Sequence, residues 1–164
     1  MIRLVAWMIC FACQVTTVFA AQAVPGIENN QPIEITSQQL EVLQSERKSV
    51  FTGEVVAKQG DMTLYADELT VFFLKEGNQI DRLEATGNVK FTQLDRTATA
   101  DKAVYRQNEE ILLLTGNAQV KQGANQIAGD EITLYVRENR SLIKSSAHNR
   151  VKAVIVPDKQ KAPQ

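Results

Sequence analysis

Cysteine is almost absent from this chain of 164 residues, because its two cysteines, Cys10 and Cys13, both lie within the first 23 residues. We expect that segment to be removed during export, which leaves a mature chain without cysteine. Disulfide bonds and thiol chemistry are therefore excluded from the mature protein. The one histidine, His148, has no cysteine to join it, so the sequence predicts no metal site, nucleophilic triad or cofactor and gives His148 no role.

The chain also lacks a long apolar run, and the best candidate lies at residues 1–23. Arg3 and the amino terminus supply positive charge, residues 4–12 are apolar, and small residues permit cleavage after Ala20 or Ala23. Polar residues follow at once, so the run is short for a membrane span. These features predict a cleavable export signal, whereas a retained segment would tether the protein to a membrane.

Proline is missing from residue 33 to residue 156, although the chain has four prolines. Strands that form continuous ladders need the backbone N–H group that proline lacks, so this absence favours an all-β domain. Charge is balanced, with 18 basic and 19 acidic side chains, which argues against nucleic acid as a partner. The sequence has neither a phosphate-binding glycine loop nor a nucleophile paired with a base, so we predict that the protein is not an enzyme.

What the chain does contain is a unit that occurs three times. Each copy has a Thr-Gly motif and, 14 residues after its glycine, an aspartate; the motifs lie at residues 52–55, 86–89 and 115–118, and the aspartates are Asp67, Asp101 and Asp130. The glycines are spaced by 34 and then 29 residues. This spacing is typical of repeat architectures whose units cover their apolar faces by stacking on one another.

Side chains within each unit alternate between apolar and polar, which predicts half-buried strands. We expect about sixteen short antiparallel strands, at residues 32–36, 39–43, 48–52, 54–58, 61–66, 68–73, 79–86, 88–93, 95–100, 102–106, 110–115, 117–121, 124–128, 131–136, 141–144 and 150–156. The apolar phase slips by one residue at each repeated aspartate, so we predict a bulge or tight corner there. A turn hydrogen bond explains these carboxylates better than a metal or acid–base cluster does.

The predicted domain covers residues 32–156, between a polar lead at 24–31 and a flexible tail at 157–164. Its two ends look like incomplete copies of the unit. Gln38 stands where the aspartate belongs, and residues 147–151 loosely echo the glycine motif. A stack of strands with such ends still has two open edges, and open edges pair with another chain.

The inward phase of the strands predicts the lining of an apolar groove. The residues that we expect there are Ile33, Ile35, Leu40, Val42, Phe51, Val55, Leu64, Leu83, Phe91, Leu114, Val120, Ile127 and Leu134. The alternative is that they pack as an ordinary core. Seven inward alanines favour the groove, since they leave the interior short of the volume that close packing needs; they are residues 57, 66, 85, 98, 100, 103 and 118.

These motifs resemble the OstA-like family of lipopolysaccharide-transport proteins over residues 31–157. The match rests on residues 31–35, on 51–60 with Ala66 and Asp67 behind them, on 113–122 with Gly129 and Asp130 behind them, and on Arg150 and Val151 before Pro157. The resemblance implies a single, slightly open, twisted β-jelly-roll. It also implies a periplasmic bridge that binds itself head to tail, with an LptC-like inner-membrane subunit at the N-terminal edge and an LptD-like outer-membrane translocon at the C-terminal edge.

Such a bridge would pass lipopolysaccharide (LPS) from an inner-membrane transporter complex to the outer membrane while its groove shields the acyl chains of lipid A. Exposing one twelve-carbon chain to water costs roughly 10 kcal/mol, at about 0.8 kcal/mol per CH₂ group, so continuous cover is the physical requirement. Two other functions stay open: a membrane-tethered LptC-like subunit, or a self-assembling β-stack without ligand. The number of subunits in a bridge and the acyl pattern of the ligand do not follow from the sequence.

Overall fold

The computed structural model describes residues 31–77, 79–146 and 149–157. The predicted export signal, most of the polar lead, His148 and most of the tail lie outside these residues. The strands are β1 (Glu34–Thr36), β2 (Gln39–Leu43), β3 (Lys48–Gln59), β4 (Met62–Phe73), β5 (Ile80–Gln93), β6 (Arg96–Arg106), β7 (Ile111–Gln122), β8 (Asn125–Tyr135), β9 (Arg140–Lys144) and β10 (Lys152–Val154), with a 3-10 helix, η1 (Gln44–Glu46), between β2 and β3. In this part of the chain we find no helix with the length and hydrophobicity of a membrane span.

All ten strands belong to one antiparallel sheet. Strands β3 to β8 pair in sequence order, because short turns connect each of them to the next. At one end β1 and β2 both pair with β3, and at the other β9 and β10 both pair with β8. Each end of the sheet is therefore an edge made of two short strands.

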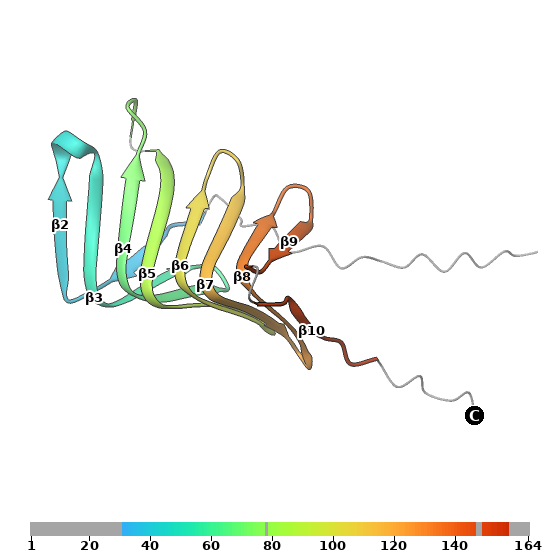
Figure 1. The fold of residues 1–164 in the computed structure, drawn as a ribbon. Coiled ribbons are helices and arrows are strands. Elements are labelled where there is room, and N and C mark those ends of the chain that lie inside the picture. Colours follow the sequence, from blue (N-terminus) through green and yellow to red (C-terminus); the bar gives the residue numbers. More distant parts are fainter. Residues whose placement is uncertain (1–30, 78, 147–148, 158–164) are drawn as a thin grey trace, which may run out of the picture.

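The sheet is bent along a line that crosses every long strand, as Figure 1 shows. We call the two parts the first limb, which contains β2, β9 and residues 48–52, 68–73, 80–86, 102–106, 111–115 and 131–135, and the second limb, which contains β1, β10 and residues 55–59, 62–66, 89–93, 96–100, 118–122 and 125–129. The ladder shifts register at the bend in all five pairs from β3–β4 to β7–β8. Because these bends coincide with the repeated motifs, the predicted corners are confirmed.

Two details of the predicted strands were wrong. The structure has ten strands rather than sixteen, because the backbone ladder continues through each bulge and joins twelve of the predicted segments into six long strands. The extra residue of each bulge also lies on the glycine strand and not at the aspartate. Between Thr52 and Val55, for example, two residues of β3 oppose the single residue Asp67 of β4.

Three of the corners contain a glycine in the left-handed region, followed by a residue that shares this conformation: Gly53 and Glu54, Gly87 and Asn88, and Gly116 and Asn117. The carboxylate of Asp67 lies against Gly87 and that of Asp101 lies against Gly116, whereas at Gly53 the amide of Gln38 takes this place. A Cβ atom at position 116 would stand only 2.8 Å from the Cβ of Asp101. Glycine is therefore required there both by the backbone and by the close approach.

A side-chain hydrogen bond crosses each corner. The Asn88 amide donates to Asp67, Asn117 donates to Asp101 and Asn149 donates to Asp130, each at 2.9 Å. At the first corner the roles are exchanged, because the Gln38 amide donates to the Glu54 carboxylate at 3.1 Å. The position held by the repeated aspartates therefore carries the hydrogen-bond acceptor at three corners, whereas at the first corner Gln38 holds this position and is the donor.

The tightest packing lies beside the corners, where the limbs converge. Small side chains face inward there on the second limb, and Val55, Val89 and Ala118 are at most 2 % exposed. Leu69, Leu114 and Ile132 meet them from the first limb and are each 1 % exposed. Farther from the corners the limbs diverge, and the space between them is no longer filled.

Candidate functional site

An apolar groove lies between the two limbs and consists of two adjoining clefts. Counted together with their open sides, they hold about 790 and 1170 Å³ of empty space. Met62, Phe91 and Leu112 line both clefts, so the clefts meet at these side chains.

Eight of the thirteen predicted lining residues contact this groove. Ile33, Leu64, Leu83, Phe91 and Leu114 line the first cleft, and Phe91, Val120, Ile127 and Leu134 line the second. Four of the seven inward alanines also line it, namely Ala57, Ala85 and Ala103 in the first cleft and Ala98 in the second. The structure therefore brings most of the predicted set to one surface, and what that surface binds stays a prediction.

The other five predicted residues lie elsewhere. Val55 is buried beside the first corner, and Ile35 and Phe51 pack against the core without lining either cleft. Leu40 and Val42 face the same side as Phe51 but are 53 % and 58 % exposed. They lie on β2, the terminal strand of the first limb, so no further strand covers them.

Several lining residues were missed in the prediction. Met62 and Leu112 have the inward parity of their strands, so the alternating pattern carried the signal for both. A polar row at the rim was not visible in the sequence, since it arises only when strand ends pair: Gln59 with Met62, Met62 with Gln93, Gln93 with Arg96, Arg96 with Gln122 and Gln122 with Asn125. This row gives the apolar groove a hydrogen-bonding margin.

Tyr105 is a further lining residue that was not among the predicted ones. It lies on β6 between Leu83 and Leu112 and is 7 % exposed. Burial, and secondarily the charge of Glu110, raises the pKa of its hydroxyl above the ordinary value. The group is therefore a neutral hydrogen-bond donor at physiological pH.

The three repeated aspartates do not converge on one site. Each is bonded to the amide of a neighbouring asparagine at its own corner, and Asp130 also accepts a bond of 2.6 Å from the Ser146 backbone N–H. The expected turn bond is thus replaced by a bond across the corner. Among the described residues, no group of three or more metal-ligating side chains is found.

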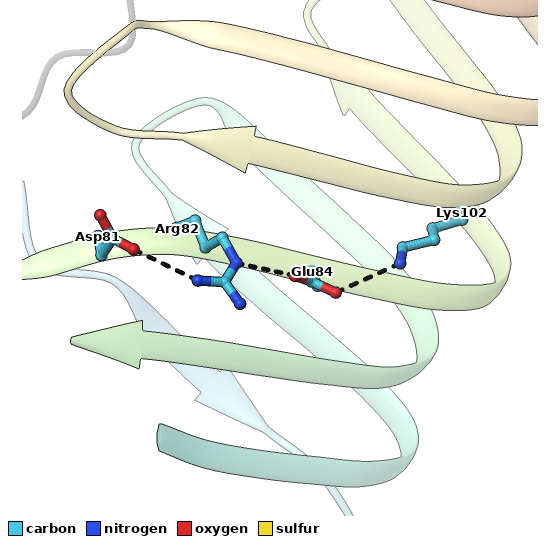
Figure 2. Close-up of polar contacts among 4 residues, drawn as sticks. All are labelled: Asp81, Arg82, Glu84 and Lys102. Atoms are coloured by element: carbon cyan, nitrogen blue, oxygen red, sulfur yellow. Dashed lines mark hydrogen bonds and ion pairs between the residues drawn. The ribbon is translucent and has the colours of Figure 1, made fainter. Parts of the chain in front are cut away.

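Charged side chains instead gather on the outer face of the sheet. Figure 2 shows one such network, in which Arg82 lies between Asp81 and Glu84, and Lys102 reaches Glu84 from the neighbouring strand. Glu84 is 2.8 Å from Arg82 and 3.3 Å from Lys102, and the hydrogen bond from Arg82 is the main reason why its pKa is lowered. This part of the outer face is therefore charged, whereas the groove between the limbs is lined mainly by apolar side chains.

Comparison with known proteins gives matches over most of the chain. Residues 34–140 match the family described as "LptA/(LptD N-terminal domain) LPS transport protein". The chain is 31 % identical over 145 residues to the lipopolysaccharide export system protein LptA of Escherichia coli K12, covering 84 % of this chain and 77 % of that one. It is also 31 % identical over 135 residues to LptA of Haemophilus influenzae, covering 78 % of each.

A solved structure has the same fold. LptH of Pseudomonas aeruginosa, described as the LptA-homologous periplasmic component of a lipopolysaccharide transport device, superposes with a TM-score of 0.70. The match covers 80 % of this chain and 99 % of that one, at 20 % sequence identity. At this identity the likeness establishes the bent sheet and nothing about the ligand.

Proposed function

Since this chain belongs to the LptA/LptD N-terminal domain family of LPS transport proteins, we propose that it is a periplasmic LPS-binding bridge protein. In this role it carries LPS from an inner-membrane transporter complex toward an outer-membrane translocon. It shields the ligand from water and catalyses no reaction, as a slightly open jelly-roll whose two limbs enclose the acyl chains of lipid A. The export signal predicted at residues 1–23 would deliver the chain to the periplasm.

The observation that carries this proposal is the groove between the limbs. Its lining is apolar on both sides, and its two clefts adjoin at Met62, Phe91 and Leu112. An acyl chain that left this surface for water would lose roughly 10 kcal/mol for twelve carbons. A groove that crosses neighbouring strands lets the chain slide without paying that cost, and the polar rim at Gln93 and Arg96 suits a sugar headgroup outside it.

The two edges of the sheet support assembly with other copies and with partners of the same fold. The strand position that carries aspartate at the other corners is Gln38 at the N-terminal edge, and the position that carries asparagine is Asn149 at the C-terminal edge. Placing β1 and β2 of one copy beside β9 and β10 of another would continue the alternation. We therefore propose head-to-tail assembly, with an LptC-like subunit at the N-terminal edge and an LptD-like translocon at the C-terminal edge.

A substitution at Leu40 would test whether copies assemble through the N-terminal edge of the sheet. The substitution Leu40→Glu adds a charge to the exposed edge strand β2 and should reduce self-association with little effect on folding. Sedimentation velocity over a range of protein concentrations would measure it, with Glu41→Gln on the opposite face of the same strand as control. Unchanged self-association of L40E would contradict assembly through this edge.

The groove is tested by a pair of adjacent leucines on β7. Leu112 lines both clefts, whereas Leu113 faces the outer side, and both are partly buried. Leu112→Gln should weaken LPS binding about five- to 150-fold, because a buried polar group without a partner costs about 1–3 kcal/mol. Leu113→Gln should bind as the wild type does.

Titration of the purified mature protein with LPS would measure both affinities, and circular dichroism would verify that each variant is folded. A self-assembling stack without ligand predicts no saturable binding by any of the three proteins. Equal affinities for L112Q and L113Q would place the ligand outside the groove.

A further inference from the structure

The groove contains one polar group that its apolar lining does not explain. The hydroxyl oxygen of Tyr105 has less than 1 Å² of exposed surface and no hydrogen-bond partner among the described residues. Buried hydroxyl groups in proteins nearly always have a partner. Leaving one unpaired costs about 1–3 kcal/mol, so the position calls for a reason.

Packing does not supply this reason. Phenylalanine would fill the same place between Leu83 and Leu112 without burying an unpaired oxygen. The equivalent inward position of β4 is already occupied by a residue without polar atoms, since Val71 pairs with Leu83 as Tyr105 does. The fold thus accepts an apolar side chain at this level of the first limb.

We infer that the Tyr105 hydroxyl is a ligand-binding group that donates a hydrogen bond to the carbonyl oxygen at the root of an acyl chain. This inference rests on the proposed function and names the part of the ligand that the groove recognises. An acyl chain is by definition joined through a carbonyl, in an ester or an amide. The carbonyl needs a donor when it leaves water, and Tyr105 lines the first cleft with a donor that is buried without a partner among the described residues.

The position of Tyr105 agrees with this role. Tyr105 itself lines the first cleft, and its strand neighbour Leu112 lines both clefts. The aliphatic part of a chain bound there would lie against apolar residues such as Leu83 and Phe91. Because the hydroxyl oxygen is covered by the protein, the walls of the groove must part to admit the carbonyl, and the new hydrogen bond then removes the penalty of the unpaired hydroxyl.

The substitution Tyr105→Phe removes the hydroxyl and keeps the ring. Two probes that differ only at the root of the chain make the test specific: glycerol monolaurate, with an ester carbonyl, and 1-O-dodecylglycerol, an ether without one. The wild type should prefer the ester, and Y105F should lose roughly three- to tenfold of that preference. Tyr65→Phe is the matched control, since Tyr65 is 42 % exposed and lines neither cleft.

A second readout comes from the protein without ligand. Y105F should melt at a higher temperature than the wild type, because it no longer buries an unpaired oxygen, so weaker ester binding could not be due to misfolding. An ester-to-ether preference that is the same in Y105F and in the wild type would overturn the inference, even if both bind LPS. If the wild type does not bind LPS at all, the proposed function fails and this inference fails with it.

Discussion

Substitution of the corner glycine Gly116 by alanine tests whether the bend depends on the close approach of two strands. Gly116 has a φ of +75°, which costs an alanine about 1–2 kcal/mol. The new methyl group would also lie 2.8 Å from the Cβ and 2.9 Å from the Cγ of Asp101. Forcing these atoms apart adds about 1–3 kcal/mol, so Gly116→Ala should lower the free energy of unfolding by about 2–5 kcal/mol in total.

Substitution of Gly77 would separate the cost of the backbone conformation from the cost of the close approach. Its φ of +77° is nearly the same, but no described atom lies within 4 Å of the position of its Cβ. Gly77→Ala should therefore show the backbone cost alone, about 1–2 kcal/mol, less a few tenths that alanine recovers by restricting the unfolded chain.

Urea unfolding followed by far-ultraviolet circular dichroism would measure both variants. Fluorescence is unsuitable because the one tryptophan, Trp7, lies in the predicted export signal. Equal losses for G116A and G77A would refute the argument from close approach, and an unchanged G116A would show that the corner does not constrain this residue.

Three other predictions concern the turns, the corner bonds and acid stability. Leu94 has a φ of +50° and is 75 % exposed, so Leu94→Gly should raise the free energy of unfolding by about 0.5–1 kcal/mol in urea; a loss of stability would mean that its side chain makes a contact that outweighs the strain. Asp101→Asn and Asn117→Asp should each destabilise the fold by up to about 1 kcal/mol, and the double variant should recover most of this loss because its donor and acceptor are merely exchanged, as at the first corner; a double variant as unstable as the sum of the single ones would contradict the pairing. The pKa of the Asp130 carboxyl is held below its ordinary value chiefly by the hydrogen bond from the Ser146 N–H, so the carboxylate stabilises the fold above the ordinary pKa and this effect disappears as pH falls through the lowered pKa. The Ser146 amide should therefore lose protection from hydrogen exchange over that acid range in the wild type, and Asp130→Asn should flatten this pH dependence. An unchanged pH profile would show that the bond to Asp130 does not protect that amide.

Much of the fold could be predicted from the sequence because its information is local. Alternation of apolar and polar residues identifies the strands, and the phase slip at Asp101 marks the corner without knowledge of its neighbours. What could not be read was the pairing across the corner, since the bond from Asn117 to Asp101 depends on which strands lie side by side. The number of strands was overestimated for a related reason, because a phase slip does not reveal whether the ladder continues through it.

The lining of the groove could also be predicted only in part. Parity identified the inward face, and it correctly assigned Phe91 and Leu134 to the space between the limbs. It failed for Leu40, whose parity is inward but whose strand is the last of its limb. Exposure at an edge depends on the number of neighbouring strands, which parity does not contain. The unpaired hydroxyl of Tyr105 was equally out of reach, because a missing partner can be recognised only among coordinates.

The alternation of corner types along the sheet means that the length of this protein can change in steps. Strand β3 would meet β6 with the same corner geometry with which it meets β4, so removal of β4 and β5 would leave both edges intact. Each such deletion or duplication would alter the span of the sheet by two strand spacings, or roughly 9.6 Å. Evolution and protein engineers alike could thus adjust how far one molecule reaches without redesigning the surfaces at its ends.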